Sequence, residues 1–268
     1  MSPEPLLSVI VANYNNERYV AECLESVLAQ TYANMEVVVY DDASSDASPG
    51  IMERFSRERP DLVRLIQGAS NRGVAAARHQ AILAARGQYI TTLDGDDYYG
   101  NRRKLESEMA LIRERAAQEG RECVSFSNVL LARGTAVPVP WGKPETIVQG
   151  MIGGRILGRD CFIPRDFVVS RDAYFRVGGY DLSLPIYEDW DLKIRLAMAH
   201  PFYYTGGIGS VYRLHGRGLS SRPFREHVPV LRAVFEKNIP LARPEERETI
   251  RAEFGHWLES RAAEASPT

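Results

Sequence analysis

Four apolar runs rich in β-branched residues, separated by segments of helical periodicity, constrain the fold of this chain more than any other feature. A continuous apolar run marks a strand buried on both faces, and strands that alternate with helices form βαβ crossovers. The sequence therefore predicts an α/β fold in which helices cover both faces of a mostly parallel sheet. The runs are LLSVIVA (6–12), MEVVVY (35–40), LVRLIQ (62–67) and QYITTL (88–93).

Helical patterns between and after these runs complete the predicted organisation. Apolar residues recur at three- and four-residue spacing from Tyr19 to Leu28, as expected of an amphipathic helix. The remaining expected elements are a helix ending near Arg59, a helix over 73–85, a charged helix with a solvated face over 102–118, a strand over 123–132, a glycine- and proline-rich loop region over 134–160, a helix over 187–200, and a helical C-terminal tail over 221–268.

Polar and acidic clusters follow three of the four predicted strands, at their carboxyl ends. The clusters are NYNN at 13–16, DDASSD at 41–46 and DGDD at 94–97. Ligands of open parallel sheets bind in the crevice outside these strand ends. Asp and Asn at such positions also form turns and helix caps, so each cluster taken singly has an ordinary structural explanation. The three clusters together favour a binding site.

The DGDD cluster gathers three carboxylates, which repel one another, so folding alone gives no reason for it. Asp94 and Asp96 alternate in an extended segment and can address one ligand, and Gly95 between them lets the backbone approach that ligand closely. Carboxylates are hard oxygen ligands that suit Mg²⁺ or Mn²⁺, which proteins commonly hold with one or two carboxylates plus substrate phosphates. The cluster predicts a site for such a cation beside a diphosphate.

Composition narrows the class of protein. The chain has 268 residues, enough for one large domain or two small ones, and a net charge of −2. A domain that binds nucleic acid usually shows a strongly basic face, so nucleic acid is not expected as a partner. The three cysteines are widely spaced and form neither a disulfide framework nor a metal-binding motif.

The sequence also indicates where the protein resides. The start has no basic leader, and no apolar stretch approaches the roughly 20 residues that a membrane span needs. We therefore expect a cytoplasmic protein. The basic, aromatic C-terminal third is compatible with peripheral docking at the inner face of a membrane, and the helical tail is suited to forming a homodimer.

Several ordered segments carry a resemblance to a known family. They read LLSVIVANYNNERYV, ESVLAQTY, VVVYDDASSDAS, NRGVAAARHQAI and GQYITTLDGDD, followed by VGGYDLSLPIYEDWDL and YRLHGRGLS. In this order they resemble the inverting, nucleotide-sugar-dependent glycosyltransferases of the GT-A fold, the group called family 2. The likeness covers residues 6–220. It implies a Rossmann-like GT-A domain at 1–220, with a nucleotide-sugar-binding half at 1–100 and an acceptor half at 101–220.

On the donor side, the resemblance implies a nucleotide site at the first two polar clusters. Ala12, Tyr14 and Asn15 would line the base and the ribose. Asp42, with Asp41 beside it, would hydrogen-bond the base, which we expect to be uracil. The implied partner is a nucleotide-diphospho-sugar, and the implied acceptor is a hydroxyl of a glycan or a lipid-linked molecule.

At the reacting centre, the resemblance implies a second set of roles. Arg78 would face the diphosphate or the sugar, and Asp94 would contact the ribose or the sugar. Asp96 would bind Mn²⁺ or Mg²⁺, and His215 would approach the metal or the departing diphosphate. Asp189 would be the catalytic base. The family's QxxRW motif is missing, which disfavours processive polysaccharide synthesis.

The chemistry of inverting transfer asks for a second carboxylate apart from the metal cluster, because one acid must take the proton of the attacking hydroxyl. The EDWD segment provides Glu188, Asp189 and Asp191 at a predicted helix start, where the helix dipole favours an ionised carboxylate. Like-charged neighbours would raise the pKa of the base. Alternatively, these acidic residues have no catalytic role and are simply the kind commonly found in the first turn of a helix, above all Asp191.

Aromatic residues near these acids suggest an acceptor surface. Trp190 lies next to Asp189, and with Glu188 it would contact the acceptor, because aromatic faces suit the apolar edges of sugars. Trp141 is a second candidate for the same role. Packing in the core is an equally good explanation for either tryptophan.

Two other functions fit parts of the pattern. A nucleotidyltransferase shares a parallel sheet and acidic metal sites, but it would need a glycine-rich, lysine-bearing loop after the first strand, where this chain has NYNNERYV. A non-enzymatic, receiver-like phospho-acceptor module would use Asp41, Asp42 and Asp94. Such a module is about half this length and needs a lysine after a later strand. We therefore expect a metal-dependent glycosyltransferase that works in the assembly of cell-surface polysaccharides or glycans.

Overall fold

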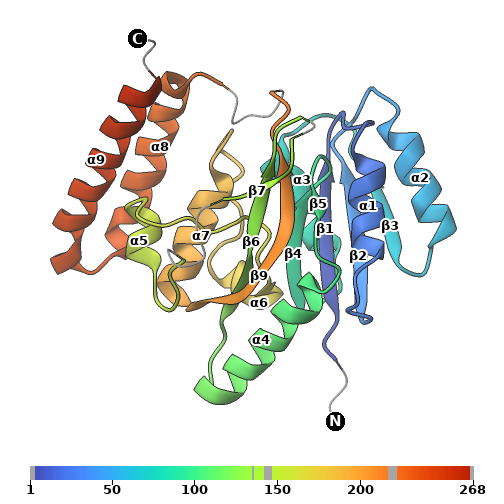
Figure 1. Cartoon of the computed structure of the whole chain (residues 1–268), viewed down its shortest axis with the longest axis horizontal. Coiled ribbons are helices and arrows are strands. Elements are labelled where there is room, and N and C mark those ends of the chain that lie inside the picture. Colours follow the sequence, from blue (N-terminus) through green and yellow to red (C-terminus); the bar gives the residue numbers. More distant parts are fainter. Residues whose placement is uncertain (1–3, 135, 142–146, 217–221, 266–268) are drawn as a thin grey trace.

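The central sheet of the protein confirms the predicted α/β fold. The structure is a computed structural model that describes residues 4–134, 136–141, 147–216 and 222–265. Its first sheet has the strand order β3-β2-β1-β4-β8, in which all neighbours are parallel except β4 and β8. Helices lie on both sides of this sheet (Figure 1). The strands are β1 (Leu7–Asn13), β2 (Met35–Asp41), β3 (Val63–Gln67), β4 (Tyr89–Asp94) and β8 (Val169–Ser170).

The apolar runs are continuous because both faces of the sheet are buried. Alternate residues of one strand point to opposite faces, so Val9 and Val11 pack in one hydrophobic cluster and Ile10 packs in the other. Helices α1 (Val20–Leu28), α2 (Ser48–Glu58) and α4 (Lys104–Glu119) contribute to the first cluster. Helix α3 (Val74–Ala84) contributes to the second.

The strand order places a topological switch between β1 and β4. From β1 the chain moves outward through β2 to β3, and then returns to the other side of β1 as β4. Crossovers on the two sides of β1 diverge at this point, which leaves a crevice at the carboxyl ends of the two strands. The fold therefore positions a ligand site next to the last residues of β1 and β4.

A second sheet was only partly predicted. Its strand order is β5-β9-β6-β7, with β5 (Tyr98–Tyr99), β6 (Val124–Ala132), β7 (Val139–Pro140) and β9 (Phe202–Arg213). The sequence patterns gave no indication of β9, because three glycines interrupt its apolar residues. One of them, Gly209, is required by packing: a Cβ there would lie 2.8 Å from Cε of Lys104. Strand β9 leads directly to the predicted residue His215.

The acceptor half contains further helices. The loop region expected at 134–160 includes a short helix, α5 (Gly153–Leu157), and the expected helix at 187–200 is α7 (Glu188–Ala199). Between them, α6 (Arg171–Arg176) follows β8. Residues 142–146 of that loop region and residues 217–221 of the YRLHGRGLS segment lie outside the described residues.

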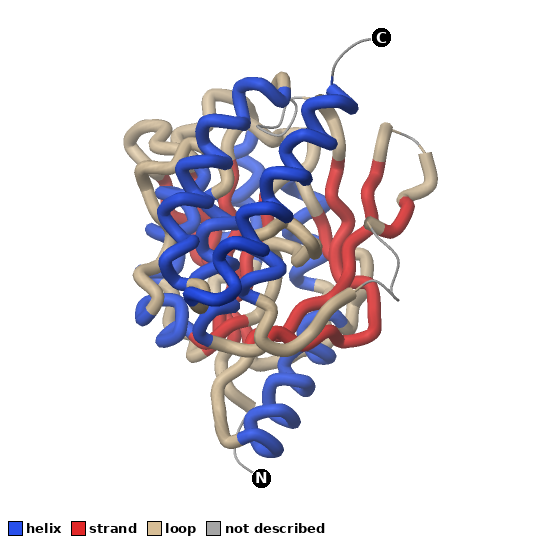
Figure 2. The backbone as a smooth tube through the Cα atoms, turned by 90° about the vertical axis from the view of Figure 1, so that its left-hand side faces the viewer, coloured by secondary structure: helices blue, strands red, loops and turns tan. Residues whose placement is uncertain are grey.

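The C-terminal tail forms two helices that pack on the acceptor half. Helices α8 (Phe224–Asn238) and α9 (Arg247–Ala265) run side by side along one face of the molecule (Figure 2). Phe235 of α8 stacks on Phe254 of α9 with ring centroids 4.1 Å apart. Both residues belong to the same hydrophobic cluster as Ile10 of the central sheet. The division into 1–220 and 221–268 stays a prediction.

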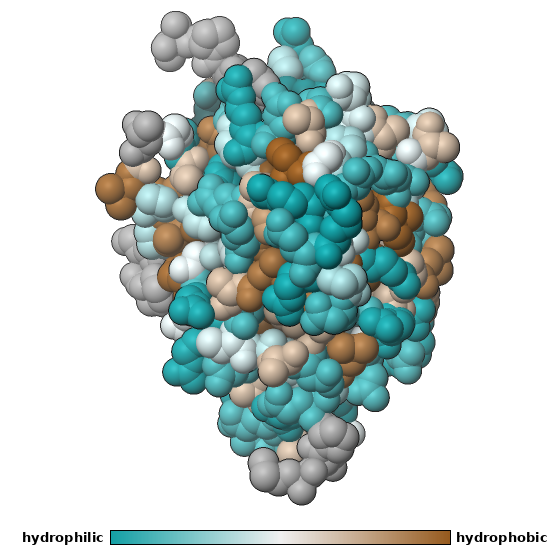
Figure 3. All heavy atoms as spheres, turned by 90° about the vertical axis from the view of Figure 1, so that its right-hand side faces the viewer, coloured by the Kyte–Doolittle hydropathy of each residue, from teal (hydrophilic) through white to brown (hydrophobic). Residues whose placement is uncertain are grey.

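The surface of the molecule beside the β3 edge of the first sheet is mostly hydrophilic. Figure 3 shows the face that carries α2, where hydrophobic residues appear only as scattered patches between polar ones. Met52 and Phe55 of α2 are buried, so the apolar side of this helix faces the core. Among the described residues, no helix has both the length and the apolar character to cross a bilayer.

Helix α4 differs from the expected solvated helix, because it carries a fully buried ion pair. Lys104 and Glu108 are each 0% exposed. The Lys104 ammonium donates to both carboxylate oxygens of Glu108, at 2.9 and 2.7 Å, and to the carbonyl oxygen of Asp166 at 2.8 Å. Burial, opposed by Lys104, raises the pKa of Glu108 to about 7. This pair anchors α4 to the second sheet.

Replacing Glu108 by Gln is expected to destabilise the protein, because Lys104 then stays buried with a weaker partner. We expect a loss of roughly 2–3 kcal/mol in the free energy of unfolding, measured by urea denaturation. The double variant K104M/E108Q removes the poorly paired cation and should recover part of the loss, reduced by the cost at Asp166, whose Oδ2 lies 3.5 Å from Nζ of Lys104. Glu114→Gln, on the exposed face of α4, is the matched control. An equal loss in the control would contradict the prediction.

Candidate active site

The polar clusters of the sequence meet at the switch point. The strand register pairs Asn13 with Asp41 and Ala12 with Asp94, so the ends of β1, β2 and β4 lie side by side. This confirms the expected convergence of the three clusters. The loops that follow are cross-linked, because the side-chain oxygen of Asn15 accepts a hydrogen bond from the backbone nitrogen of Ser45 at 2.8 Å.

The residues predicted for the nucleotide base shape the loops around the crevice. Asp41 accepts a hydrogen bond from Nδ2 of Asn13 at 3.1 Å. Asp42 accepts from the backbone nitrogens of Arg72 and Gly73, at 3.0 and 2.8 Å. Both aspartates are buried, whereas Tyr14 is 46% exposed. Tyr14 and Asn15 are therefore the exposed members of the predicted nucleotide set.

The three aspartates of the DGDD cluster lie close enough to share a cation. One oxygen from each of Asp94, Asp96 and Asp97 lies within 4.8 Å of the other two. Two of the three aspartates share a cationic partner. Arg165 pairs with Asp94 at 3.0 Å and also contacts Asp97. Burial raises the pKa of Asp97 to about 8, against Arg165 and together with the charges of Asp96 and Asp94.

Asp96 keeps a different partner and is the most open of the three. Its Oδ2 lies 2.9 Å from Nε2 of His215, and the Asp96 side chain is 22% exposed. The His215 ring stacks on Tyr19, with centroids 5.3 Å apart. A carboxylate-rich set with one imidazole fits a hard divalent cation such as Mn²⁺ or Mg²⁺. The expected metal ligands Asp96 and His215 thus lie side by side, and their role stays a prediction.

A buried arginine joins the two acidic clusters. Arg78 is 2% exposed. Its Nη2 donates to Oδ1 of Asp94 at 2.6 Å, and its Nη1 donates to Oε1 of Glu188 at 2.6 Å. Against the effect of burial, Asp94 and other negative groups raise the pKa of Arg78. The metal-type cluster on β4 and the EDWD segment of α7 therefore belong to one network, although 110 positions separate Arg78 from Glu188.

The candidate base has a partner that the sequence analysis did not assign. Nζ of Lys193, one helical turn further along α7, lies 2.9 Å from Oδ2 of Asp189. Burial opposes ionisation, but Lys193, Arg78 and Arg165 hold the pKa of Asp189 well below its usual range. The expected rise in the pKa of this residue is therefore wrong. It occurs instead at Glu188, where burial dominates and the charge of Asp189 adds to it.

Of the two tryptophans considered for the acceptor surface, Trp190 is buried and Trp141 is partly exposed. Trp190 is 2% exposed, its indole nitrogen donates to the carbonyl of Ile156 at 2.9 Å, and its ring stacks on Phe254. Its side chain thus lies in the core and does not present the acceptor surface that we expected. Trp141 is 38% exposed and stacks on Phe162 with centroids 4.1 Å apart.

Gly95 and Asp191 also have structural reasons that the sequence did not reveal. A Cβ on Gly95 would lie 2.4 Å from Oδ1 of Asn13, so a protein side chain already occupies the space expected for a ligand. Asp191 is fully buried and accepts hydrogen bonds from Arg195 at 2.6 Å and from Asn238 of α8 at 2.7 Å. Asp191 therefore joins α7 to the C-terminal helices.

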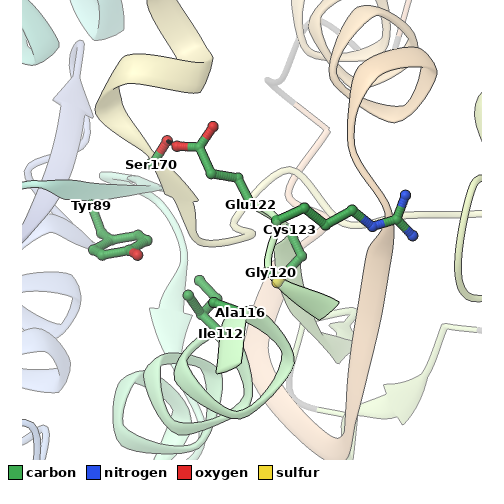
Figure 4. A pocket seen from close by; sticks show the side chains of 8 residues that line it. Tyr89, Ile112, Ala116, Gly120, Glu122, Cys123 and Ser170 are labelled. Carbon is green, nitrogen blue, oxygen red and sulfur yellow. Dashed lines mark hydrogen bonds between the residues drawn. The ribbon is translucent and has the colours of Figure 1, made fainter. Parts of the chain in front are cut away.

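A cavity of about 330 Å³ lies away from these groups (Figure 4). Tyr89, the first residue of β4, lines it, whereas Asp94 is the last residue of that strand. At about 3.3 Å per residue the two positions are roughly 17 Å apart. This cavity is therefore not the predicted site. Its other lining residues are Ile112, Ala116, Gly120, Arg121, Glu122, Cys123 and Ser170.

Sequence reasoning missed two cationic residues of the site, Lys193 and Arg165, and it considered a third, Arg213, only as part of a basic stretch that could meet phosphate. Lys193 follows Asp189 by four positions, so helical spacing alone could have found it. Arg165 lies in a loop without a recognisable pattern. Arg213 ends the unpredicted β9, and its Nη1 donates to the backbone oxygen of Asp96 at 2.7 Å. The last two reach the site only through tertiary structure.

Two solved structures share this fold over most of the chain. TarS 1–349 of S. aureus, crystallised with UDP-GlcNAc, superposes with a TM-score of 0.73 at 22% identity, over 92% of this chain and 71% of that one. A mannosyltransferase of Pyrobaculum calidifontis, in complex with GDP-Man and Mn²⁺, gives a TM-score of 0.67 at 21% identity, over 100% and 77%. The architecture is therefore the GT-A fold.

Comparisons of the sequence also find a similarity to glycosyltransferases. An uncharacterized protein of Mycobacterium tuberculosis, Rv1520, is 29% identical over 223 residues, which are 80% of this chain and 60% of that protein. Glycosyltransferase GlyG of Streptococcus pneumoniae is 40% identical over 92 residues, 34% of this chain and 30% of its own length. The chain thus spans about 60% of the length of its mycobacterial relative. Residues 8–136 match the model of glycosyl transferase family 2, and the GT-A architecture agrees with this match.

Proposed function

We propose that this protein transfers a sugar from a nucleotide-diphospho-sugar, with uracil as the expected base, to a hydroxyl of a glycan or lipid-linked acceptor. The transfer inverts the anomeric centre and depends on a divalent cation. Its place is the assembly of cell-surface polysaccharides or glycans, on the cytoplasmic side. The observation that carries the proposal is the bridge from Asp94 through Arg78 to Glu188, because it places the donor-side acids next to the candidate base Asp189.

Asp189 would act as the base on the acceptor side. The oxygen of the acceptor hydroxyl forms a bond to the anomeric carbon while the bond from that carbon to the diphosphate oxygen breaks. The hydroxyl proton passes to the carboxylate of Asp189, and the bonding electron pair leaves with the nucleoside diphosphate. The lowered pKa of Asp189 keeps this carboxylate ionised at neutral pH but makes it a weak base, so the proton would pass to it only as the new bond makes the acceptor oxygen acidic.

The residues around Asp96 would handle the negative charge of the leaving group. Asp96 and His215 would hold Mn²⁺ or Mg²⁺, which when bound neutralises charge on the diphosphate. Arg165 and Arg213 add positive charge at the same place. Arg165 forms ion pairs with Asp94 and Asp97, and Arg213 donates to the backbone oxygen of Asp96. Charge that is already oriented in this way stabilises a leaving diphosphate without reorganisation during the reaction.

A thermal-shift experiment tests the donor site. UDP with Mn²⁺ should raise the melting temperature of the protein, since a ligand that binds only the native state stabilises it by mass action. Asp96→Asn should lose most of this shift, because the variant weakens the metal site. Asp160→Asn, whose side chain is 46% exposed and pairs with Arg155, is the matched control.

The same experiment separates the proposed function from its alternatives. GDP and dTDP with Mn²⁺ test the expectation of uracil, and acetyl phosphate tests a phospho-acceptor module. A shift with acetyl phosphate and none with any nucleoside diphosphate would refute the glycosyltransferase proposal.

A further inference from the structure

Arg159, just beyond α5, has an environment that the proposed reaction does not explain. Its guanidinium carbon lies 4.1 Å from the ring centroid of Trp190, 4.7 Å from that of Trp257 and 5.2 Å from that of Tyr187. These three rings surround the cation and stabilise it through their π faces. We call the three residues Tyr187, Trp190 and Trp257 the aromatic cage.

The aromatic cage leaves the buried Nε of Arg159 without an acceptor. Nε of Arg159 is buried and has no hydrogen-bond partner, and no described carboxylate forms an ion pair with this residue. The contrast with Arg155 is clear, because its Nε pairs with Asp160 at 2.6 Å. An aromatic ring attracts a cation but accepts no strong N–H···O bond, and a guanidinium has five N–H donors in a rigid fork.

The cage holds its shape through its own hydrogen bonds. The hydroxyl of Tyr187 lies 2.9 Å from Nδ1 of His227 in α8, and the indole of Trp190 donates to Ile156. Trp257 belongs to α9 and stacks on Phe254. Because α7, α8 and α9 all contribute, Arg159 sits in a preformed setting, which is the arrangement expected of a binding residue.

This setting adjoins the candidate base. Tyr187 and Trp190 lie on either side of Asp189 in the sequence, at the start of α7. The carboxylate of Asp189 is near enough to favour the charged form of Arg159 electrostatically. Burial, the dominant effect, lowers the pKa of Arg159 to about 10, so the guanidinium is positively charged at neutral pH.

We infer that Arg159 binds an anionic oxygen group, a phosphate or a carboxylate, carried by the acceptor next to the hydroxyl that Asp189 activates. This inference rests on the proposed function, since it takes Asp189 to mark the acceptor side. It makes the acceptor an anionic glycan or a phosphate-bearing molecule. The fork of the guanidinium matches either anion in two parallel hydrogen bonds.

Tryptophan fluorescence gives a direct test, because two of the three tryptophans of the chain belong to the cage. In a Trp141→Phe background the signal reports on Trp190 and Trp257 alone. Glucose 6-phosphate, glucuronate and neutral glucose would be titrated at constant ionic strength. We expect a saturable response to at least one anion, and the stronger of the two identifies phosphate or carboxylate as the preferred group.

Variants of the same background locate the response. Arg159→Gln should weaken anion binding roughly 10- to 100-fold, the loss expected for charge-assisted hydrogen bonds. Arg159→Lys, which keeps the charge but loses the fork, should bind the anion with intermediate affinity. Arg155→Gln removes the same charge four positions away and should leave binding unchanged. Equal binding in Arg159→Gln, or no saturable response to either anion, would overturn the inference.

The test distinguishes this inference from the proposed function. UDP with Mn²⁺ probes the donor site of the same protein separately. Stabilisation by UDP without an anion response at Arg159 would remove the anion site and leave the glycosyltransferase proposal intact. An anion response without any nucleotide binding would refute the proposed function and, with it, the assignment of Arg159 to an acceptor.

Discussion

Asp189→Asn should abolish most of the sugar transfer while the protein stays folded. An amide cannot take the proton of the acceptor hydroxyl, so the rate should fall by roughly 10²- to 10⁴-fold, the usual contribution of a general base. The amide oxygen can still accept the hydrogen bond from Lys193, which preserves the local structure. The measurement is the rate of product formation by mass spectrometry, across a panel of nucleotide sugars with the acceptor in excess.

The donor side provides the necessary control for this result. Asp189→Asn should keep the affinity for UDP with Mn²⁺, because Asp189 belongs to α7 and the metal cluster follows β4. Asp160→Asn removes a more exposed carboxylate outside the site (46% exposed, against 26% for Asp189) and should turn over normally. Turnover equal to that of the unaltered protein in Asp189→Asn would exclude this residue as the base.

Arg78→Gln should cause the largest loss of stability among single substitutions at the site. The variant leaves Glu188 buried without a cation and Asp94 with one partner fewer. Breaking a buried ion pair typically costs 3–5 kcal/mol, and we expect roughly 4–5 kcal/mol here because two carboxylates are affected. Urea denaturation at pH 7 measures it. Exposed Arg57→Gln on α2 is the matched control.

The loss in Arg78→Gln should depend on pH in a defined direction. Against burial, Arg165 and Arg78 hold the pKa of Asp94 below its usual range. A carboxylate with a lowered pKa stabilises the fold above the pKa of the unfolded state, about 4, and this contribution disappears as the pH falls further. The difference between Arg78→Gln and the unaltered protein should therefore narrow below pH 4.

A double variant tests the origin of the effect. In R78Q/E188Q the neutral amide replaces the orphaned carboxylate, so part of the stability should return. A double variant as unstable as the sum of the two single variants would show that Arg78 contributes by packing and not by its charge.

The sequence predicted the first half of the molecule well because the signal there is local. Strands such as LLSVIVA are apolar at nearly every position because both faces are covered, and this pattern is visible without any partner. The polar ends of β1, β2 and β4 were expected to converge because parallel strands present their carboxyl ends at one edge. The register of Ala12 with Asp94 confirms this expectation.

The second half was harder because its contacts are not periodic. Strand β9 contains Gly206, Gly207 and Gly209, and Gly209 is small because Lys104 of a distant helix passes over it. No residue near Gly209 in the sequence indicates that Lys104 lies so close to it. Trp190 looked suited to an acceptor surface next to Asp189, but α9 covers it with Phe254.

By itself, the sequence determined the parallel sheet, its helices and the gathering of aspartates after β4, since each depends on short-range patterns of apolar and charged residues. Only the tertiary structure decided which charges meet. Arg78 pairs with Asp94 and Glu188, Arg165 with Asp94 and Asp97, and Lys193 with Asp189. Together with burial, these contacts shift the pKa values of Asp94, Asp189 and Glu188. Electrostatic interactions depend on the distance between charged groups and on their burial, and neither quantity can be read from the order of the residues alone.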